Sequence, residues 1–89
     1  MAQEFLTVDL GAEREVAGLV TRGAGSVWLE AFRLSYSSDG LGWSAVQDPA
    51  SFTDIVFPGN HEGEEELAQF LPRLLSTRYI RIAPLRLTT

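Results

Sequence analysis

The side chains that could perform catalysis or bind a metal are few and lie in one acidic stretch. His61 is the only histidine, and it precedes Glu62, Glu64, Glu65 and Glu66. No G-x-S-x-G motif accompanies this histidine, so the sequence offers no recognisable nucleophile and base of a hydrolase. Carboxylates can bind Ca²⁺, but their spacing here matches no calcium-loop pattern. We therefore expect a solvated acidic loop, no catalytic or metal-binding residue, no cofactor and no enzyme activity.

The charge balance narrows the class of partner. The 89-residue chain has twelve acidic and seven basic residues, all of the latter Arg, which gives a net charge of -5. Because nucleic acids demand a clustered positive field, we expect no nucleic-acid partner. An anionic membrane is disfavoured by the same argument. The chain contains no cysteine, and we identify no signal peptide at its start. Its length fits a single domain, residues 1–89.

Strands rather than helices must position the polar residues, because apolar side chains recur with a period of two. We predict strands at residues 5–10, 15–21, 28–37, 43–46, 52–57 and 77–82. Residues 67–71 fit either a strand or a helical turn, and Pro72 and Pro84 are expected to end their runs. Ile80 and Ile82 share one face and are expected to point into the core. Short strands at this spacing favour an antiparallel sandwich or barrel.

Five motifs in collinear order resemble those of discoidin domains, also called coagulation factor V/VIII C-type domains. They are Phe5–Gly11 (FLTVDLG), Val16–Gly23 (VAGLVTRG), Phe32–Gly40 followed by Trp43 (FRLSYSSDG with W), Val56–Asn60 (VFPGN) and Thr77–Pro84 (TRYIRIAP). The motifs span nearly the whole chain, which makes the resemblance specific although each motif alone is weak. One of the motifs also predicts local structure directly: its Asp39-Gly40 pair is the strongest hairpin-turn signal in the chain.

The resemblance implies an all-β fold, an antiparallel jelly roll or distorted β-barrel sandwich of the discoidin-like, galactose-binding-domain-like type. It also implies a non-enzymatic adhesion module, secreted or on the cell surface, with loops at one barrel end binding the ligand. Relative to the family pattern we expect residues 1–89 to be an incomplete domain, without the early segment and the last strand. The sheet edges thereby exposed are expected to be covered by the remaining strands or by a second copy through self-association.

One of the family's ligand loops corresponds to the connection between the second and third predicted strands. The candidate ligand-binding residues are Arg22, Gly23, Ala24, Gly25, Ser26, Val27 and Trp28. An arginine can supply planar donors to a carboxylate, and glycines let a ligand approach the backbone. The same residues could simply make a tight connection between strands. We expect a protein or glycan ligand; the alternatives are binding to anionic phospholipid such as phosphatidylserine, and a spacer domain without a ligand.

Overall fold

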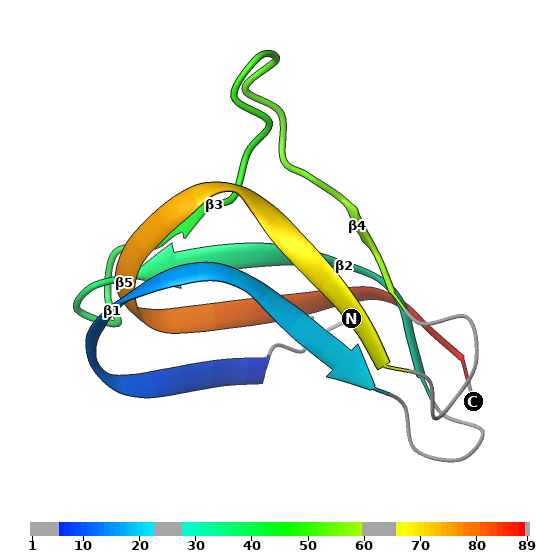
Figure 1. The fold of residues 1–89 in the computed structure, drawn as a ribbon, viewed down its shortest axis with the longest axis horizontal. Helices are drawn as coiled ribbons and strands as arrows, with labels where there is room; N and C mark the ends of the chain where they lie inside the picture. Colours follow the sequence, from blue (N-terminus) through cyan, green and yellow to red (C-terminus); the bar gives the residue numbers. More distant parts are fainter. Residues whose placement is uncertain (1–5, 23–27, 60–65, 89) are drawn as a thin grey trace.

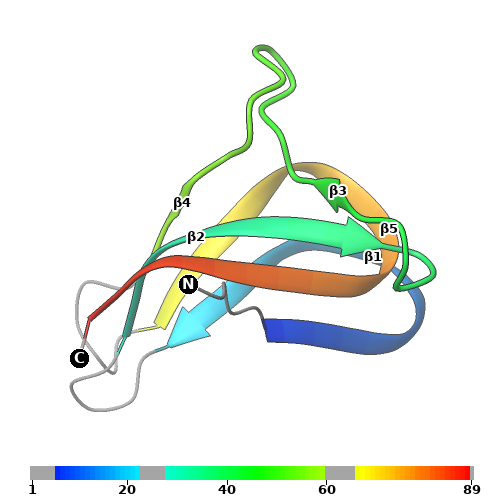
Figure 2. The same ribbon diagram turned by 180° about the vertical axis from the view of Figure 1, so that it is seen from behind.

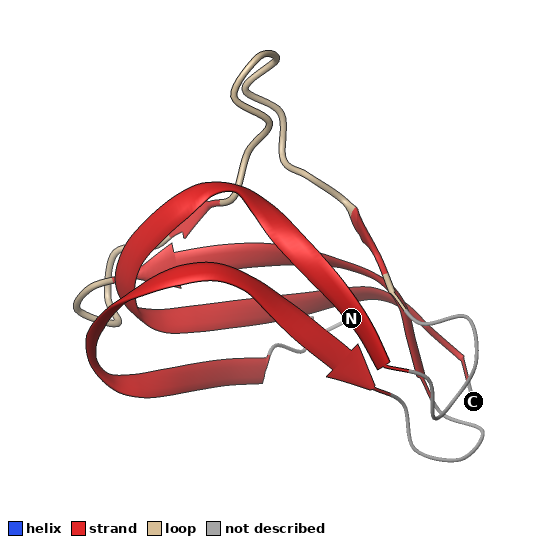
Figure 3. Cartoon of the chain, in the orientation of Figure 1, coloured by secondary structure: helices blue, strands red, loops and turns tan. Residues whose placement is uncertain are grey.

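The protein, seen in a computed structural model that describes residues 6–22, 28–59 and 66–88, is built from strands, with no helix among those residues (Figures 1 and 3). The strands are β1 (Leu6–Arg22), β2 (Trp28–Ser37), β3 (Ser44–Ala45), β4 (Phe57–Pro58) and β5 (Glu66–Thr88). They form one sheet in the order β1-β5-β2-β3, with β4 also paired to β2, and every pairing is antiparallel. The all-β, antiparallel prediction is confirmed. The described part has no helix able to cross a membrane.

The long strands β1 and β5 bend together and supply both layers of the barrel (Figures 1 and 2). The start of β1 pairs with the second half of β5, as in Leu6 opposite Ile82, and the end of β1 pairs with the beginning of β5, as in Arg22 opposite Glu66. The sequence predicted two separate strands here, residues 5–10 and 15–21, with Gly11 ending the first. That prediction is wrong, because a single strand covers both. Gly11 has a φ of 83° and bends the strand, while pairing resumes beyond a register shift.

Two prolines expected to end strands instead lie inside β5. Pro72 falls between Phe70 and Leu75, where β5 has no partner residues in β1. Pro84 pairs with Phe32 next to a register shift in β2, beyond the last residue of β5 that pairs with β1. A proline is tolerated where the hydrogen-bond ladder is interrupted, because its missing N–H then leaves no ladder bond unmade. Residues 67–71 are therefore strand, not a helical turn.

The predicted strand at residues 52–57 is a further error. Only Phe57 and Pro58 form a strand there, and the residues before them belong to a hairpin that projects from the sheet (Figure 1). We name residues 47–55 the finger; its two sides meet at a bridge between Gln47 and Asp54. Of the apolar residues that suggested this strand, Phe57 is buried in the core, whereas Phe52 and Val56 are exposed.

The core lies between the two layers. Its buried residues are Phe32, Leu34, Val46, Phe57 and Leu75, with the rings of Phe32 and Phe57 stacked at 5.5 Å. Ile80 and Ile82 pack against this cluster, which confirms the predicted face of β5. A cavity of about 240 Å³ lined by apolar side chains of β1, β2 and β5 remains beside it. Exposed apolar residues flank this region on the long strands, at Leu6, Val20, Phe70 and Leu74.

Candidate functional site

The candidate ligand-binding segment, Arg22 to Trp28, joins the end of β1 to the start of β2. Arg22 is paired with Glu66 at the beginning of β5, and Trp28 is paired with Thr88 at its end. Because β5 turns back on itself, these four positions lie at the same end of the barrel (Figure 1). Both flanking residues of the segment, Arg22 and Trp28, are therefore held in paired strands at the same end of the barrel.

The individual residues of that segment are described only in part. Arg22 and Trp28 lie in strands, as the backbone pairing shows. Gly23, Ala24, Gly25, Ser26 and Val27 lie outside the described residues. The same is true of His61 and of the acidic run apart from Glu66, which begins β5. Among the residues that are described, no group of three or more potential ligands could hold a metal ion.

Sequence reasoning missed one charged residue near this end. Arg86, an exposed side chain of β5, is paired with Ala31, only a few positions from the start of β2. Beside it in β5 lies Leu85, an apolar side chain that is 42% exposed. Their signal in the sequence was weak because Pro84 was expected to end the strand before them. With β5 continuing to Thr88, a cation and an apolar side chain come to the barrel end that carries the candidate segment.

At the opposite end of β2, the polar groups of the turn bond to one another. The carboxylate of Asp39 accepts hydrogen bonds from the backbone N–H groups of Leu41 (2.8 Å) and Gly42 (3.0 Å), and from the hydroxyl of Ser37 (3.1 Å). The N–H bonds of Leu41 and Gly42, with the Ser37 hydroxyl, lower the pKa of Asp39. Gly40, with a φ of 78°, completes the predicted turn. Through its Oδ1 atom, which accepts all three bonds, this carboxylate stabilises the hairpin.

A second group of charged residues joins the bend of β1 to β5. The guanidinium of Arg78 donates to both carboxylate oxygens of Asp9, at 2.9 and 3.1 Å, and the N–H of Gly11 donates to the same carboxylate at 2.8 Å. These bonds, first that from Arg78, lower the pKa of Asp9. The interaction holds the bend of β1 against β5. Because both oxygens of this carboxylate already accept hydrogen bonds, a ligand would have to compete with Arg78 for them.

Trp43 packs against two side chains of β5. Its ring lies 3.9 Å from the guanidinium carbon of Arg81 and meets the ring of Tyr79 edge to face at a centroid distance of 6.4 Å. The sequence placed Trp43 at the start of the return strand, and the structure confirms that position, directly before β3. Trp43 is not a member of the buried core cluster but packs with side chains of β5 on the other face. The motifs Asp9–Gly11, Ser38–Gly40 and Thr77–Ile82 thus hold the fold together.

Comparison with known proteins agrees with the resemblance. The family model of the F5/8 type C domain matches residues 1–89. The chain is 33% identical to lactadherin of Sus scrofa over 87 residues, covering 93% of this chain and 21% of that protein. It is 38% identical to neuropilin-1 of Rattus norvegicus over 90 residues, 96% of this chain and 10% of that protein. It is 31% identical to the rat discoidin, CUB and LCCL domain-containing protein 2 over 88 residues. The chain therefore spans only about a tenth to a fifth of these relatives.

Proposed function

Because this chain belongs to the F5/8 type C (discoidin) domain family, we propose that it is a non-catalytic extracellular binding module that recognises a protein or glycan ligand through the segment from Arg22 to Trp28. The observation that supports this site is the pairing of both its flanking residues with the two ends of β5. A loop held on paired strands can present variable side chains from a rigid base. At the other end of β2, by contrast, the Oδ1 atom of the turn carboxylate already accepts three hydrogen bonds that stabilise the hairpin.

Each residue type in the segment has a role in this proposal. Arg22 supplies parallel donors to a carboxylate or another anionic group of the ligand. Gly23 and Gly25 allow close approach to the backbone, and Ser26 donates or accepts a hydrogen bond. Trp28 offers a ring face for stacking on a sugar or an apolar side chain. Arg86, near the same end of the barrel, adds a second cation.

A binding screen with matched variants tests the site. The chain is applied to an array of immobilised glycans and extracellular proteins, together with R22Q, W28A and the control R33Q, whose arginine lies exposed in β2. The expected result is binding to at least one immobilised ligand, reduced tenfold or more in R22Q or W28A and unchanged in R33Q. If R22Q and W28A alter the melting temperature but no interaction, the spacer reading holds and the proposed site is wrong.

Sedimentation with vesicles separates the membrane alternative. Phosphatidylcholine vesicles with and without phosphatidylserine are compared at low and high salt. Because the net charge is -5, we expect no pelleting with either vesicle, since an acidic domain gains little from an anionic surface. Salt-sensitive pelleting that requires phosphatidylserine would show that the domain binds anionic membranes and would contradict the proposed protein or glycan ligand.

We also propose self-association through the outer edge of β1. Within the described residues β1 pairs with β5 alone, which leaves its other edge open. Leu6 and Val20 on this strand are 58% and 61% exposed, and a long apolar edge strand is a template for pairing with another chain. Size-exclusion chromatography with light scattering should show a dimer or larger species that L6K/V20K converts to monomer. A monomer at all concentrations would contradict the proposal.

A further inference from the structure

The finger, residues 47–55, is a rigid projection and not a slack loop. The carboxylate of Asp48 accepts hydrogen bonds from the N–H groups of Ala50 (2.8 Å) and Ser51 (3.3 Å). The backbone of Asp48 exchanges two more, its N–H donating to Thr53 O at 2.9 Å and its carbonyl accepting from Phe52 N–H at 2.8 Å. At its base, the side chain of Gln47 donates to Asp54 at 3.1 Å. These bonds join residues of the finger to one another and fix its shape where it projects from the sheet (Figures 1 and 2).

Phe52 in this finger is unfavourable for the fold in two respects. Its φ is 58°, in the left-handed region that a glycine or asparagine adopts more easily than a bulky residue. Its side chain is 74% exposed, so the strained backbone is not compensated by burial of the ring. Strained residues of this kind cluster at active sites and ligand-binding positions. We therefore look for a role of the Phe52 ring in binding rather than in core packing.

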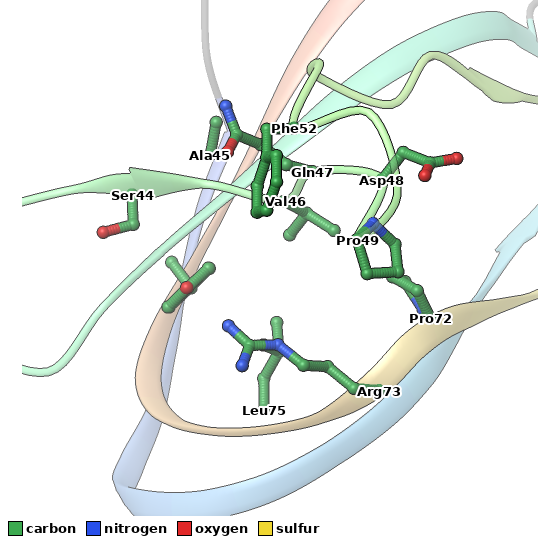
Figure 4. Close-up of a pocket in the computed structure, with 11 residues that line it drawn as sticks. Ser44, Ala45, Val46, Gln47, Asp48, Pro49, Phe52, Pro72, Arg73 and Leu75 are labelled. Carbon is green, nitrogen blue, oxygen red and sulfur yellow. The ribbon is translucent and has the colours of Figure 1, made fainter.

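A cavity of about 540 Å³ opens beside the finger, within the range of small-molecule sites. Phe52 lines its rim, and the bend of β5 forms the facing wall (Figure 4). The lining residues are Tyr36, Ser44, Ala45, Val46, Gln47, Asp48, Pro49, Phe52, Pro72, Arg73 and Leu75. The lining comes from the end of β2, from β3 and the finger, and from the bend of β5, whereas Arg22 ends β1 and Trp28 begins β2.

Arg73 gives this cavity its charge. The guanidinium points from the bend of β5 into the open space (Figure 4). The residue is exposed, and within the described part of the chain it forms no hydrogen bond or ion pair. The lining contains one carboxylate, Asp48, which remains an anion; its Oδ1 atom accepts two hydrogen bonds in the turn of the finger, and it points away from Arg73 (Figure 4). The part of the cavity around Arg73 therefore presents cationic donors beside aromatic and proline surfaces.

We propose that this cavity binds an acidic sugar residue of a glycan. The carboxylate of the sugar pairs with the guanidinium of Arg73 in a two-point contact. The C–H face of the ring lies against Phe52, with Pro49 completing the apolar surface. Gln47 and Ser44 donate to and accept from the sugar hydroxyls. A polyanion such as a nucleic acid would need several cations, and the described lining offers a single one. The site is independent of the segment Arg22 to Trp28.

Titration of the ¹⁵N-labelled chain with glucuronate and, separately, N-acetylneuraminate tests the proposal by NMR, with glucose as the neutral control. We expect at least one acid to shift amide signals of residues 44–52 and 72–75, and glucose to leave them unmoved. R73Q should weaken that binding at least tenfold, whereas R33Q should not change it. Absence of shifts with both acids overturns the proposal, as does equal binding of glucose or an equal loss in R33Q.

Phe52→Gly distinguishes a binding role from a structural one. Glycine removes the ring but suits the positive φ, so the melting temperature should stay equal or rise while affinity for the acidic sugar falls at least fivefold. A loss of both stability and affinity would mean that Phe52 supports the fold, and the proposed stacking role would be wrong. Shifts confined to residues near Arg22 and Trp28 would place the sugar at the other site and equally refute this one.

Discussion

Gly18 is predicted to be intolerant of even a methyl group, because the backbone of β5 lies where a Cβ atom would be. A Cβ built on Gly18 would lie 2.3 Å from the carbonyl oxygen of Gln69 and 3.2 Å from the Cα of Phe70, both backbone atoms of the paired strand. Real Cβ atoms essentially never come within 3.0 Å of another atom, so the strands would have to separate by roughly 0.7 Å. The φ of this glycine is not the reason for its presence, since the constraint is space alone.

The size of the effect follows from two opposing contributions. Overpacking of this kind costs about 1–3 kcal/mol, and replacement of glycine by alanine recovers about 0.4–1 kcal/mol by restricting the unfolded chain. We therefore expect G18A to lower the free energy of unfolding by about 1–2 kcal/mol, or Tm by roughly 5–15 °C for a domain of this size. Gly42 is the control, because nothing lies within 4 Å of its Cβ position and its φ is not positive. G42A should be neutral or slightly stabilising.

Urea unfolding followed by tryptophan fluorescence measures both variants against the parent chain. The midpoint should fall in G18A at an unchanged m value, since the surface exposed on unfolding is the same. Equal stability of G18A and G42A would refute the close approach of β1 and β5. That result would also remove the physical explanation for Gly18 in the Val16–Gly23 motif.

Three further predictions concern the polar contacts. Thr77 is fully buried and its hydroxyl donates to Ser37 O at 2.8 Å, so T77V should cost about 1–3 kcal/mol in urea unfolding and T77S less, whereas equal costs would contradict a role for the hydroxyl. Asp9 and Asp39 have lowered pKa values, so stability should be retained above about pH 4 and lost below it, and D9N/D39N should flatten this acid limb of a Tm-versus-pH curve. Gly40 has a φ of 78°, so G40A should lower stability by about 1–2 kcal/mol in urea, and a neutral result would rule out backbone strain.

Sequence periodicity predicted β2 and the inward face of Ile80 and Ile82 because local alternation determines both. It failed where pairing depends on the partner strand. Gly11 bends β1 without ending it, and this is visible only once Leu6–Asp9 and Arg14–Arg22 are seen to share β5 as their partner. Pro72 is tolerated inside β5 because of a register break that the residues around it do not encode.

The two proposed binding sites were accessible to sequence reasoning to different degrees. The candidate segment Arg22 to Trp28 was proposed from motif order, since it begins in the last two residues of the Val16–Gly23 motif. The cavity at the finger was missed because Phe52 was assigned to a predicted strand at residues 52–57. Its positive φ and its proximity to Arg73, 21 positions later in the chain, arise from tertiary structure. No local pattern in the sequence brings these two residues together.

The shared use of β5 by its neighbours also governs how the chain can acquire its structure. Leu6 pairs with Ile82 and Trp28 with Thr88, so β1 and β2 cannot complete their pairing until β5, the last of the described strands, has been synthesised. Loop closure over such separations is slow, which gives the domain a high contact order and a late transition to the native state. In the meantime two apolar strands stay unpaired on the nascent chain, where chaperone capture competes with misassembly.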